Sequence, residues 1–198
     1  MIFIHNVSSM GGKESKNIEP RTLHELRNQV EFTDDEIQNW FQEYNSSLAK
    51  GQKELTREEF KNVYNSIFIG DATEFAEHVF RTFDHDRSGT VNFKEFLVGL
   101  HVSGSSNLDT KLRWAFKMYD INGNGMIDKD EMKTIVSAIF KMTAAKVPEE
   151  LNTPEKMTEK FFKELDVDQD GEISWDEFER GANKDPIILS LLQCDPDA

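Results

Sequence analysis

The sequence predicts an all-α fold made of four helix–loop–helix units that pair into two lobes. A glutamate followed by a large apolar residue recurs along the chain, at intervals of 36, 36 and 46 residues. Repeats of this length indicate one structural unit that is used several times. The four pairs begin at Glu59, Glu95, Glu131 and Glu177. Apolar residues at helical spacing accompany these segments, and three of the segments share a glycine that favours a sharp turn between two helices.

The helices are predicted from apolar residues that recur three or four positions apart. In chain order, these residues are Phe60, Val63, Tyr64, Ile67 and Phe68; Phe75, Val79, Phe80 and Phe83; Leu112, Ala115, Phe116 and Tyr119; and Met157, Phe161, Phe162 and Leu165. Asp71 is a suitable N-cap for the second group, and Pro154 stands at the first helical position before the fourth. A last short apolar helix is predicted from Ile187 to Leu192.

Five segments follow from these patterns. The Gly/Ser-rich stretch at 102–107 predicts a division between two lobes of two units each. We therefore expect an N-terminal extension at 1–22, an N-lobe at 23–102, a linker at 103–109, a C-lobe at 110–183 and a C-terminal helix and tail at 184–198.

Composition excludes several classes of function. The formal net charge is −14, with 17 acidic and 11 basic residues before Gly104 and 20 and 12 after it, so both halves are acidic. This charge disfavours nucleic-acid binding. The sequence has no apolar run of the roughly 18 residues that could span a bilayer. The single Cys194 excludes an internal disulfide and favours a reducing, cytoplasmic location. No zinc-protease or nucleotide-binding pattern is present, so we expect no enzyme.

The spacing of the carboxylates predicts calcium binding. Three loops, Asp84–Glu95, Asp120–Glu131 and Asp166–Glu177, fit the EF-hand pattern D-x-[DN]-x-[DNS]-G-x5-E. Calcium takes six to eight oxygen ligands, which such a loop supplies from side chains at positions 1, 3 and 5, a backbone carbonyl at 7 and a bidentate glutamate at 12. The predicted ligands are Asp84, Asp86, Ser88, Thr90 and Glu95; Asp120, Asn122, Asn124, Met126 and Glu131; and Asp166, Asp168, Asp170, Glu172 and Glu177. Three matches in one register argue against acidic turns without metal, so three calcium ions are expected.

The first loop departs from this pattern. Counting back from Glu59 places Leu48, Lys50 and Gln52 at positions 1, 3 and 5, and Lys53 where the glycine stands in the others. Lysines at these positions exclude calcium, so a structural role is expected. Position 8 is apolar in every loop, as Leu55, Val91, Ile127 and Ile173. These residues suit short antiparallel β contacts between paired loops. We number the units hand 1 to hand 4.

Longer stretches resemble the neuronal calcium sensor family, which includes recoverin, the visinin-like proteins and hippocalcin. They are Phe32–Thr33, Gly70–Ala72, Phe75–Asp84, Trp114–Asp120 and Leu191–Asp195. The resemblance runs from residue 10 to the end of the chain and is closest to the visinin-like and hippocalcin branch, because recoverin has a disabled fourth hand. In two respects the sequence differs from the family: hand 1 lacks the usual Cys-Pro pair, and nine residues precede the Met-Gly with which the family begins.

The resemblance implies a calcium sensor whose N-lobe exposes an apolar groove with calcium and captures an amphipathic helix of a target protein. The candidate groove residues are Trp40, Phe41, Phe60, Val63, Tyr64, Phe68, Phe75, Val79 and Phe80. Two alternatives remain open. These residues could all belong to the core of a calcium buffer that hardly opens, and the helix from Ile187 to Leu192 could either cap the C-lobe or occupy the groove.

The N-terminal segment carries a lipidation pattern. Residues 10–15, Met-Gly-Gly-Lys-Glu-Ser, fit M-G-x-x-x-[ST] for N-myristoylation. If translation starts at Met10, Gly11 is expected to carry myristate. One acyl chain gives reversible membrane attachment. The resemblance implies that this attachment depends on calcium, so we expect a cytoplasmic protein with calcium-dependent peripheral membrane association.

Overall fold

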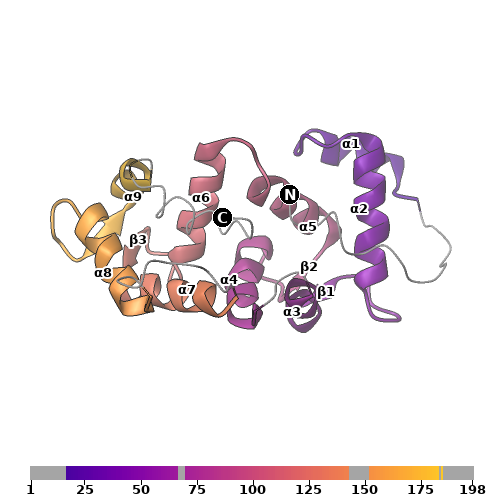
Figure 1. The fold of residues 1–198 in the computed structure, drawn as a ribbon. Coiled ribbons are helices and arrows are strands. Elements are labelled where there is room, and N and C mark those ends of the chain that lie inside the picture. Colours follow the sequence, from indigo (N-terminus) through magenta and orange to yellow (C-terminus); the bar gives the residue numbers. More distant parts are fainter. Residues whose placement is uncertain (1–16, 67–69, 143–151, 183, 185–198) are drawn as a thin grey trace.

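The computed structural model describes residues 17–66, 70–142, 152–182 and 184. Its elements, in order, are α1 (Pro20–Arg27), α2 (Asp34–Ser47), β1 (Leu55–Thr56), α3 (Arg57–Asn65), α4 (Thr73–Phe83), β2 (Thr90–Val91), α5 (Phe93–Ser103), α6 (Leu108–Tyr119), β3 (Met126–Asp128), α7 (Lys129–Met142), α8 (Pro154–Leu165), β4 (Glu172–Ser174) and α9 (Trp175–Ala182). The chain runs from α1 and α2 at one end of the molecule to α8 and α9 at the other (Figure 1). This composition confirms the predicted all-α class. Gly11, Phe68 and the helix predicted from Ile187 to Leu192 lie outside the described residues.

Short polar signals start the helices. Thr33, Thr56 and Asn92 each cap a helix through the backbone N–H of a glutamate three residues later, and that glutamate bonds back to the cap's own N–H. This reciprocal capping box satisfies two amides that the helix leaves without partners. Thr153 caps α8 directly before Pro154. α1 was not predicted; Pro20 at its first position favours a helical start.

The paired loops meet through two short antiparallel sheets, as predicted. β1 pairs with β2, so that Leu55 lies opposite Val91. β3 pairs with β4, so that Ile127 lies opposite Ile173. All four residues are at most 1% exposed. The position-8 side chains therefore join hand 1 to hand 2 and hand 3 to hand 4 inside the core.

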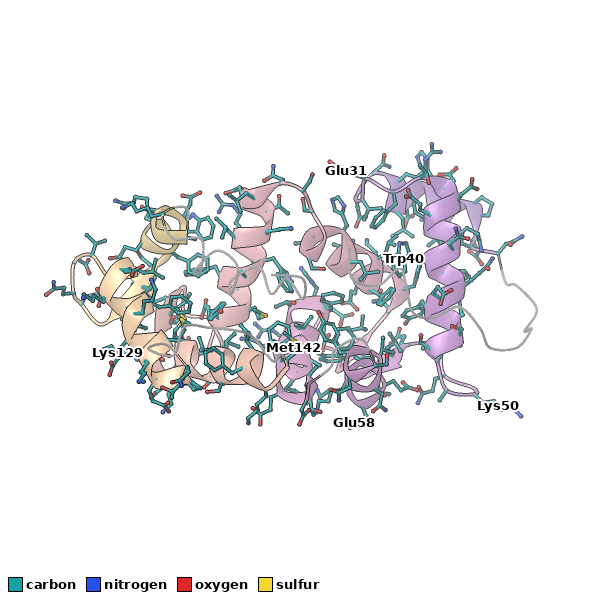
Figure 2. The ribbon with its side chains drawn as sticks, viewed as in Figure 1. Glu31, Trp40, Lys50, Glu58, Lys129 and Met142 are labelled. Atoms are coloured by element: carbon teal, nitrogen blue, oxygen red, sulfur yellow. The ribbon has the colours of Figure 1, made fainter. Side chains whose placement is uncertain are left out.

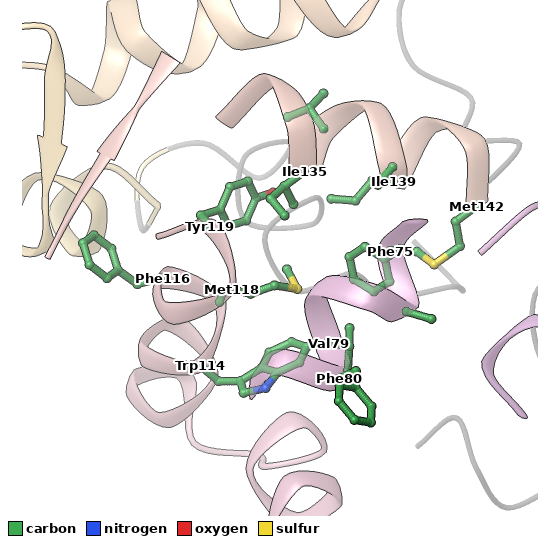
Figure 3. Close-up of a cluster of buried hydrophobic side chains, with 14 of the residues drawn as sticks. Phe75, Val79, Phe80, Trp114, Phe116, Met118, Tyr119, Ile135, Ile139 and Met142 are labelled. Carbon is green, nitrogen blue, oxygen red and sulfur yellow. The ribbon is translucent and has the colours of Figure 1, made fainter. Parts of the chain in front are cut away.

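One hydrophobic core spans both pairs of hands. Its residues come from α2 to α9, and α4 packs against both α6 and α7 (Figure 3). Phe75 of α4 points toward Met142 of α7 (Figure 3), whereas Phe80 meets Phe60 of α3 edge-on, with ring centroids 5.5 Å apart. The cores of the two predicted lobes are therefore continuous.

Backbone contacts also tie hand 2 to hand 3. The amides of Gly70 and Asp71 donate to the carbonyls of Met142 and Lys141, at 3.1 and 3.0 Å. A Cβ on Gly70 would lie 2.5 Å from the Met142 carbonyl oxygen, so only glycine permits this approach. Lys141 also forms an ion pair with Glu74 across the same boundary, at 2.6 Å.

A second, smaller apolar cluster lies at the N-terminal end. α1 and the residues beside it contribute Ile18, Leu26 and Val30, which pack with Ile37 of α2 and Leu97 of α5. Trp40 and Phe41 are only partly buried and pack against this cluster. Trp40 points from α2 toward α5 (Figure 2), where its ring meets that of Phe96 edge-on at 6.2 Å. Residues 17–30 therefore cover one side of the N-lobe.

Candidate calcium sites

Every loop ends in a glutamate whose two oxygens are held by opposite ends of the loop. In hand 2, Glu95 Oε2 accepts from the Asn92 amide at 3.1 Å, and Oε1 accepts from the amides of His85 and Asp86 at 3.0 and 3.2 Å. In hand 3, Glu131 accepts in the same way from the backbone amides of Asn122 and Asp128. In hand 4, Glu177 accepts from the backbone amides of Val167, Asp168 and Ser174. The closing carboxylates are thus held across the loops that they close.

These glutamates also belong to the helix caps. The residue at position 9 accepts from the amide of the closing glutamate, as Asn92, Asp128 and Ser174 do in hands 2, 3 and 4. This capping role of position 9 was not predicted from the calcium pattern. The capping-box pattern, a small polar residue followed three positions later by glutamate, was the signal that could have found it. Loop closure and the start of the following helix therefore depend on the same two residues.

The first aspartate of each intact loop points inward. Asp84 accepts from the amides of Ser88 and Gly89 at 2.9 and 3.0 Å, and Asp120 accepts from the amide of Gly125 at 3.0 Å. In hand 4, Asp166 Oδ2 accepts from Gly171, while its Oδ1 is buried and has no hydrogen-bond partner. A buried acceptor without a partner is costly, and a bound cation would satisfy it. The residues of hand 4 therefore fit a metal ion.

Carboxylates gather in hands 2 and 4. In each hand, oxygens of three carboxylates lie within 4.8 Å of one another; the residues are Asp84, Asp86 and Glu95, and Asp166, Asp168 and Glu177. Like charges at this distance repel, and a divalent cation among them removes the repulsion. Hand 3 carries amides at two ligand positions, Asn122 and Asn124, which offer oxygens without charge.

Side chains at positions 3 and 5 are held by the loop itself. Asp86 Oδ1 and Asn122 Oδ1 each accept from the amide two residues later, at 2.9 Å in both cases. Such turns fix one oxygen and leave the other available. The bonds from Ser88 hold the pKa of Asp86 below its usual value, so this carboxylate stays ionised and ready for a cation. The predicted carbonyl ligand at position 7 is the first residue of a strand in each intact loop. These residues are Thr90 in β2, Met126 in β3 and Glu172 in β4.

The backbone of the intact loops takes a left-handed path at position 6. Gly89, Gly125 and Gly171 have φ of 84°, 88° and 91°. Arg87 and Gln169, at position 4 of hands 2 and 4, also have positive φ, of 59° and 61°. Residues with a Cβ pay roughly 1–2 kcal/mol for this conformation. The hydrogen bonds to the aspartates offset that cost, so the turn is fixed even at non-glycine positions.

Hydrogen bonds control the ionisation of the closing glutamate in hand 4. Burial by itself would raise the pKa of Glu177, but hydrogen bonds from Ser174 and from the amides of Val167 and Asp168 hold it below the usual value. The charged form that calcium requires is therefore the favoured one.

Hand 1 keeps the frame of a calcium loop without its oxygens. Glu59 is held as in the other hands, by the amides of Ala49 and Thr56 at 3.0 and 2.9 Å. When the Gln52 amide is oriented to donate, its nitrogen lies 2.6 Å from both Glu59 oxygens. The Gln52 amide therefore occupies the place beside the carboxylate that an ion would take in an intact loop. Figure 2 shows Lys50 at the outer edge of the loop.

Hand 1 also reaches a ligand of hand 2. Glu54 Oε2 accepts from the Thr90 hydroxyl at 2.6 Å, and that hydroxyl lies 3.2 Å from the hydroxyl of the predicted ligand Ser88. No element of the calcium pattern points to Glu54, so this contact was not predicted from the sequence. Glu54 directly precedes β1, whose pairing with β2 places Thr56 opposite Thr90 and so brings the two loops side by side.

The predicted groove residues are mostly buried in this conformation. Exposure is at most 8% for the five that belong to the main core, which are Phe60, Tyr64, Phe75, Val79 and Phe80. Trp40, Phe41 and Val63 are partly exposed. A groove that involves the buried five therefore requires the helices to separate.

Family comparisons agree with this geometry. A family model described as an EF-hand domain pair matches residues 109–182, and another of the same description matches residues 51–101. Recoverin from Homo sapiens is 35% identical over 192 residues, which cover 94% of this chain and 95% of recoverin. S-modulin from Aquarana catesbeiana is 36% identical, covering 94% of each chain. Neuronal calcium sensor 1 from Lymnaea stagnalis is 37% identical over 188 residues, covering 93% of this chain and 97% of the relative.

Fold and loops together define an EF-hand protein that binds calcium. The coverage and identity of the relatives go further, and the chain belongs to the neuronal calcium sensor family. The expected activity is therefore calcium sensing and not catalysis. Among the described residues, no helix combines the length and apolar character needed to cross a membrane.

Proposed function

We propose that the protein binds three calcium ions, at hands 2, 3 and 4, and uses them to regulate target proteins. The observation that carries the proposal is the common frame of the three loops. Each has an aspartate at position 1, a glycine with positive φ at position 6 and a closing glutamate held across the loop. Hand 1 has the same closing glutamate but offers no side-chain carboxylate at positions 1, 3 or 5, so it takes no ion.

The fifteen residues predicted from the pattern are the proposed ligands. Position 1 contributes Asp84, Asp120 and Asp166, and position 12 contributes both oxygens of each closing glutamate. When calcium is bound, it supplies two positive charges per loop and relieves the repulsion among the carboxylates. In the sensor range, EF-hand dissociation constants are roughly 10⁻⁷–10⁻⁵ M.

Calcium in hand 2 is proposed to open the N-lobe for an amphipathic helix of a target protein. The route is short, because the closing Glu95 is also the third residue of α5 and its loop is paired with hand 1 through Leu55 and Val91. Trp40 and Phe41 are already partly exposed, which supports a surface that grows on opening. Such anchors at helical spacing suit helix-in-groove recognition.

A calcium buffer is the second candidate function. It is favoured by the burial of five groove residues in the main core, because a lobe that keeps them there presents little apolar surface. Buffer and sensor would bind the same ions. They differ in what calcium does to the exposed apolar area.

Dye binding distinguishes the two candidates. Adding calcium to the purified protein should raise the fluorescence of a dye that binds exposed apolar surface, because the N-lobe opens. Glu95→Gln should remove most of this rise, since it disables the ion next to α5. Glu177→Gln, the matched change in hand 4, should leave most of it.

Two results would contradict the sensor proposal. If calcium causes no rise in the unmodified protein, the buffer reading holds. If Glu95→Gln keeps both the rise and calcium-dependent binding of a target helix, the C-lobe reads calcium instead.

Myristoylation of Gly11 is proposed on the pattern at residues 10–15 and on the family membership. A chain translated from Met10 would expose Gly11 after removal of the methionine. The single acyl chain would give reversible membrane attachment that depends on calcium. Intact-mass measurement of protein from its own cells should give a chain that starts at Gly11 and carries one myristoyl group. An unacylated chain that starts at Met1 would rule this switch out.

A further inference from the structure

Arg81 of α4 reaches across the boundary between hands 2 and 3. Its Nη1 donates to the carbonyl oxygens of Asp120 and Ile121, at 2.8 and 2.5 Å. Its Nη2 donates to the carbonyls of Met118 and, more weakly, Lys117, at 2.6 and 3.4 Å. One guanidinium thus binds four carbonyls between Lys117 and Ile121, where α6 ends and the hand 3 loop begins.

These carbonyls need a partner because of where they lie. The last carbonyls of a helix have no acceptor role within the helix, and their oxygens carry the negative end of its dipole. A cation with several donors in a rigid plane satisfies both conditions. Burial lowers the pKa of Arg81, and the charges of Asp120 and Glu131 act in the opposite direction, which places the guanidinium in the electrostatic field of the hand 3 loop.

The same arginine is linked to hand 2 through its own helix. Asp84, the first proposed ligand of hand 2, follows Arg81 by three residues and is the C-cap of α4. The neighbouring Thr82 accepts a hydrogen bond from Trp114 Nε1 of α6 at 3.0 Å. A displacement of the end of α4 therefore acts on the first ligand of hand 2 and on the entry to hand 3 together.

We propose that Arg81 positions the entry of the hand 3 loop and carries the coupling between calcium binding at hand 2 and at hand 3. This inference rests on the proposed function, since it requires ions in both hands. Calcium at hand 3 would hold Asp120 in place as a ligand and, through the Asp120 carbonyl, would fix Arg81 and the end of α4. Hand 2 then binds its ion with Asp84 already placed. Because coupling is reciprocal, calcium at hand 2 raises the affinity of hand 3 by the same factor.

If Arg81 acted only through its positive charge, replacing it would have a different effect on calcium binding. A cation beside the hand 3 loop repels calcium, so removing it would tighten binding at hand 3 while leaving hand 2 unaffected. Positioning predicts instead that the two affinities become independent. Measuring the coupling between the sites, instead of one affinity, separates the two effects.

Two substitutions at Arg81 test the proposal. Arg81→Lys keeps the charge but has a single flexible ammonium, which cannot hold four carbonyls at once. Arg81→Gln removes the charge as well. Lys141→Gln is the matched control, because Lys141 also forms a cationic contact across the boundary, to Glu74, but does not touch the hand 3 loop. The change in each affinity is followed by the amide resonances of Gly125 in hand 3 and Gly89 in hand 2 during calcium titration.

Coupling is defined as the factor by which Glu95→Gln, which disables hand 2, weakens calcium binding at hand 3. We expect at least about fivefold in the parent protein, the lower end of ordinary site–site coupling. Arg81→Lys and Arg81→Gln should reduce the factor to below about twofold, and Lys141→Gln should keep it. In chelator, amide exchange at residues 122–125 should also be faster in the Arg81 variants than in Lys141→Gln.

Each failure has a separate meaning. If the parent protein binds no calcium at hand 3, the proposed function fails and this inference with it. Three results would overturn only the role of Arg81 while the ions still bind. They are no coupling in the parent protein, coupling that survives in the folded Arg81→Lys protein, and coupling that is lost equally in Lys141→Gln. Arg81→Lys keeps the charge and the length of the side chain, so the test remains available if Arg81→Gln does not fold.

Discussion

Removing calcium should lower the midpoint of thermal unfolding by roughly 25–50 °C, compared with the protein in about 1 mM free calcium. An ion bound about a thousandfold above its dissociation constant stabilises the folded state by about 4 kcal/mol, so three ions contribute about 12 kcal/mol. For a chain of this size, each kcal/mol corresponds to about 2–4 °C. The physical source is the relief of repulsion within the loops, as the formal charge falls from −14 to −8. Scanning calorimetry in calcium and in chelator measures the difference.

The matched control is the protein with all three closing glutamates changed to glutamine. Its midpoint in calcium should approach that of the parent protein in chelator, because the same ions are missing. A shift of less than about 10 °C in the parent protein would mean that fewer or much weaker sites are present.

Glu131→Gln should reduce the number of bound calcium ions from three to two. This glutamate supplies two ligand oxygens of hand 3, where the amides Asn122 and Asn124 leave fewer charged ligands than in hands 2 and 4. We expect the affinity of hand 3 to fall by more than about 100-fold, since even the partners of metal ligands contribute 10–100-fold. Titration calorimetry counts the ions that remain.

Hand 1 offers the control for this measurement. Glu59 occupies the same place in its loop as Glu131 and is held by the same kind of bonds, from Ala49 and Thr56. Glu59→Gln therefore perturbs a closing residue without removing an ion, and three ions should still bind. Finding four ions in the parent protein, or only two, would refute the assignment of hand 1 or of hand 3.

Most of the fold was predictable, because it depends on local patterns. The helical spacing around Phe75 and Phe161, together with the apolar residue at position 8 of each loop, predicted both the helices and the two sheets, and the structure confirms them. α1 was missed because a helix of eight residues that buries a single side chain, Leu26, gives little periodic signal.

Contacts between the hands were not predictable from the motif. A loop pattern fixes ligands within twelve residues, but Glu54 of hand 1 contacts Thr90 of hand 2, and Arg81 of hand 2 contacts the start of the hand 3 loop. The Glu54 contact depends on how the side chains of the paired loops lie, and the Arg81 contact depends on how α4 packs against α6. The motif within one loop determines neither. The ligand assignments and the count of three ions remain predictions that rest on the pattern and on the geometry of the loops.

The close approach of Gly70 to the end of α7 affects how the chain can be divided. Because Phe75 and Val79 share one core with Ile139 and Met142, a cut near Gly104 would uncover a wide apolar face on each half. Neither half would then be an autonomous module, although each contains two hands and each matches its own domain-pair model. Co-expressed fragments would have to associate with each other to rebuild this shared core. The unit that folds cooperatively is therefore the set of all four hands.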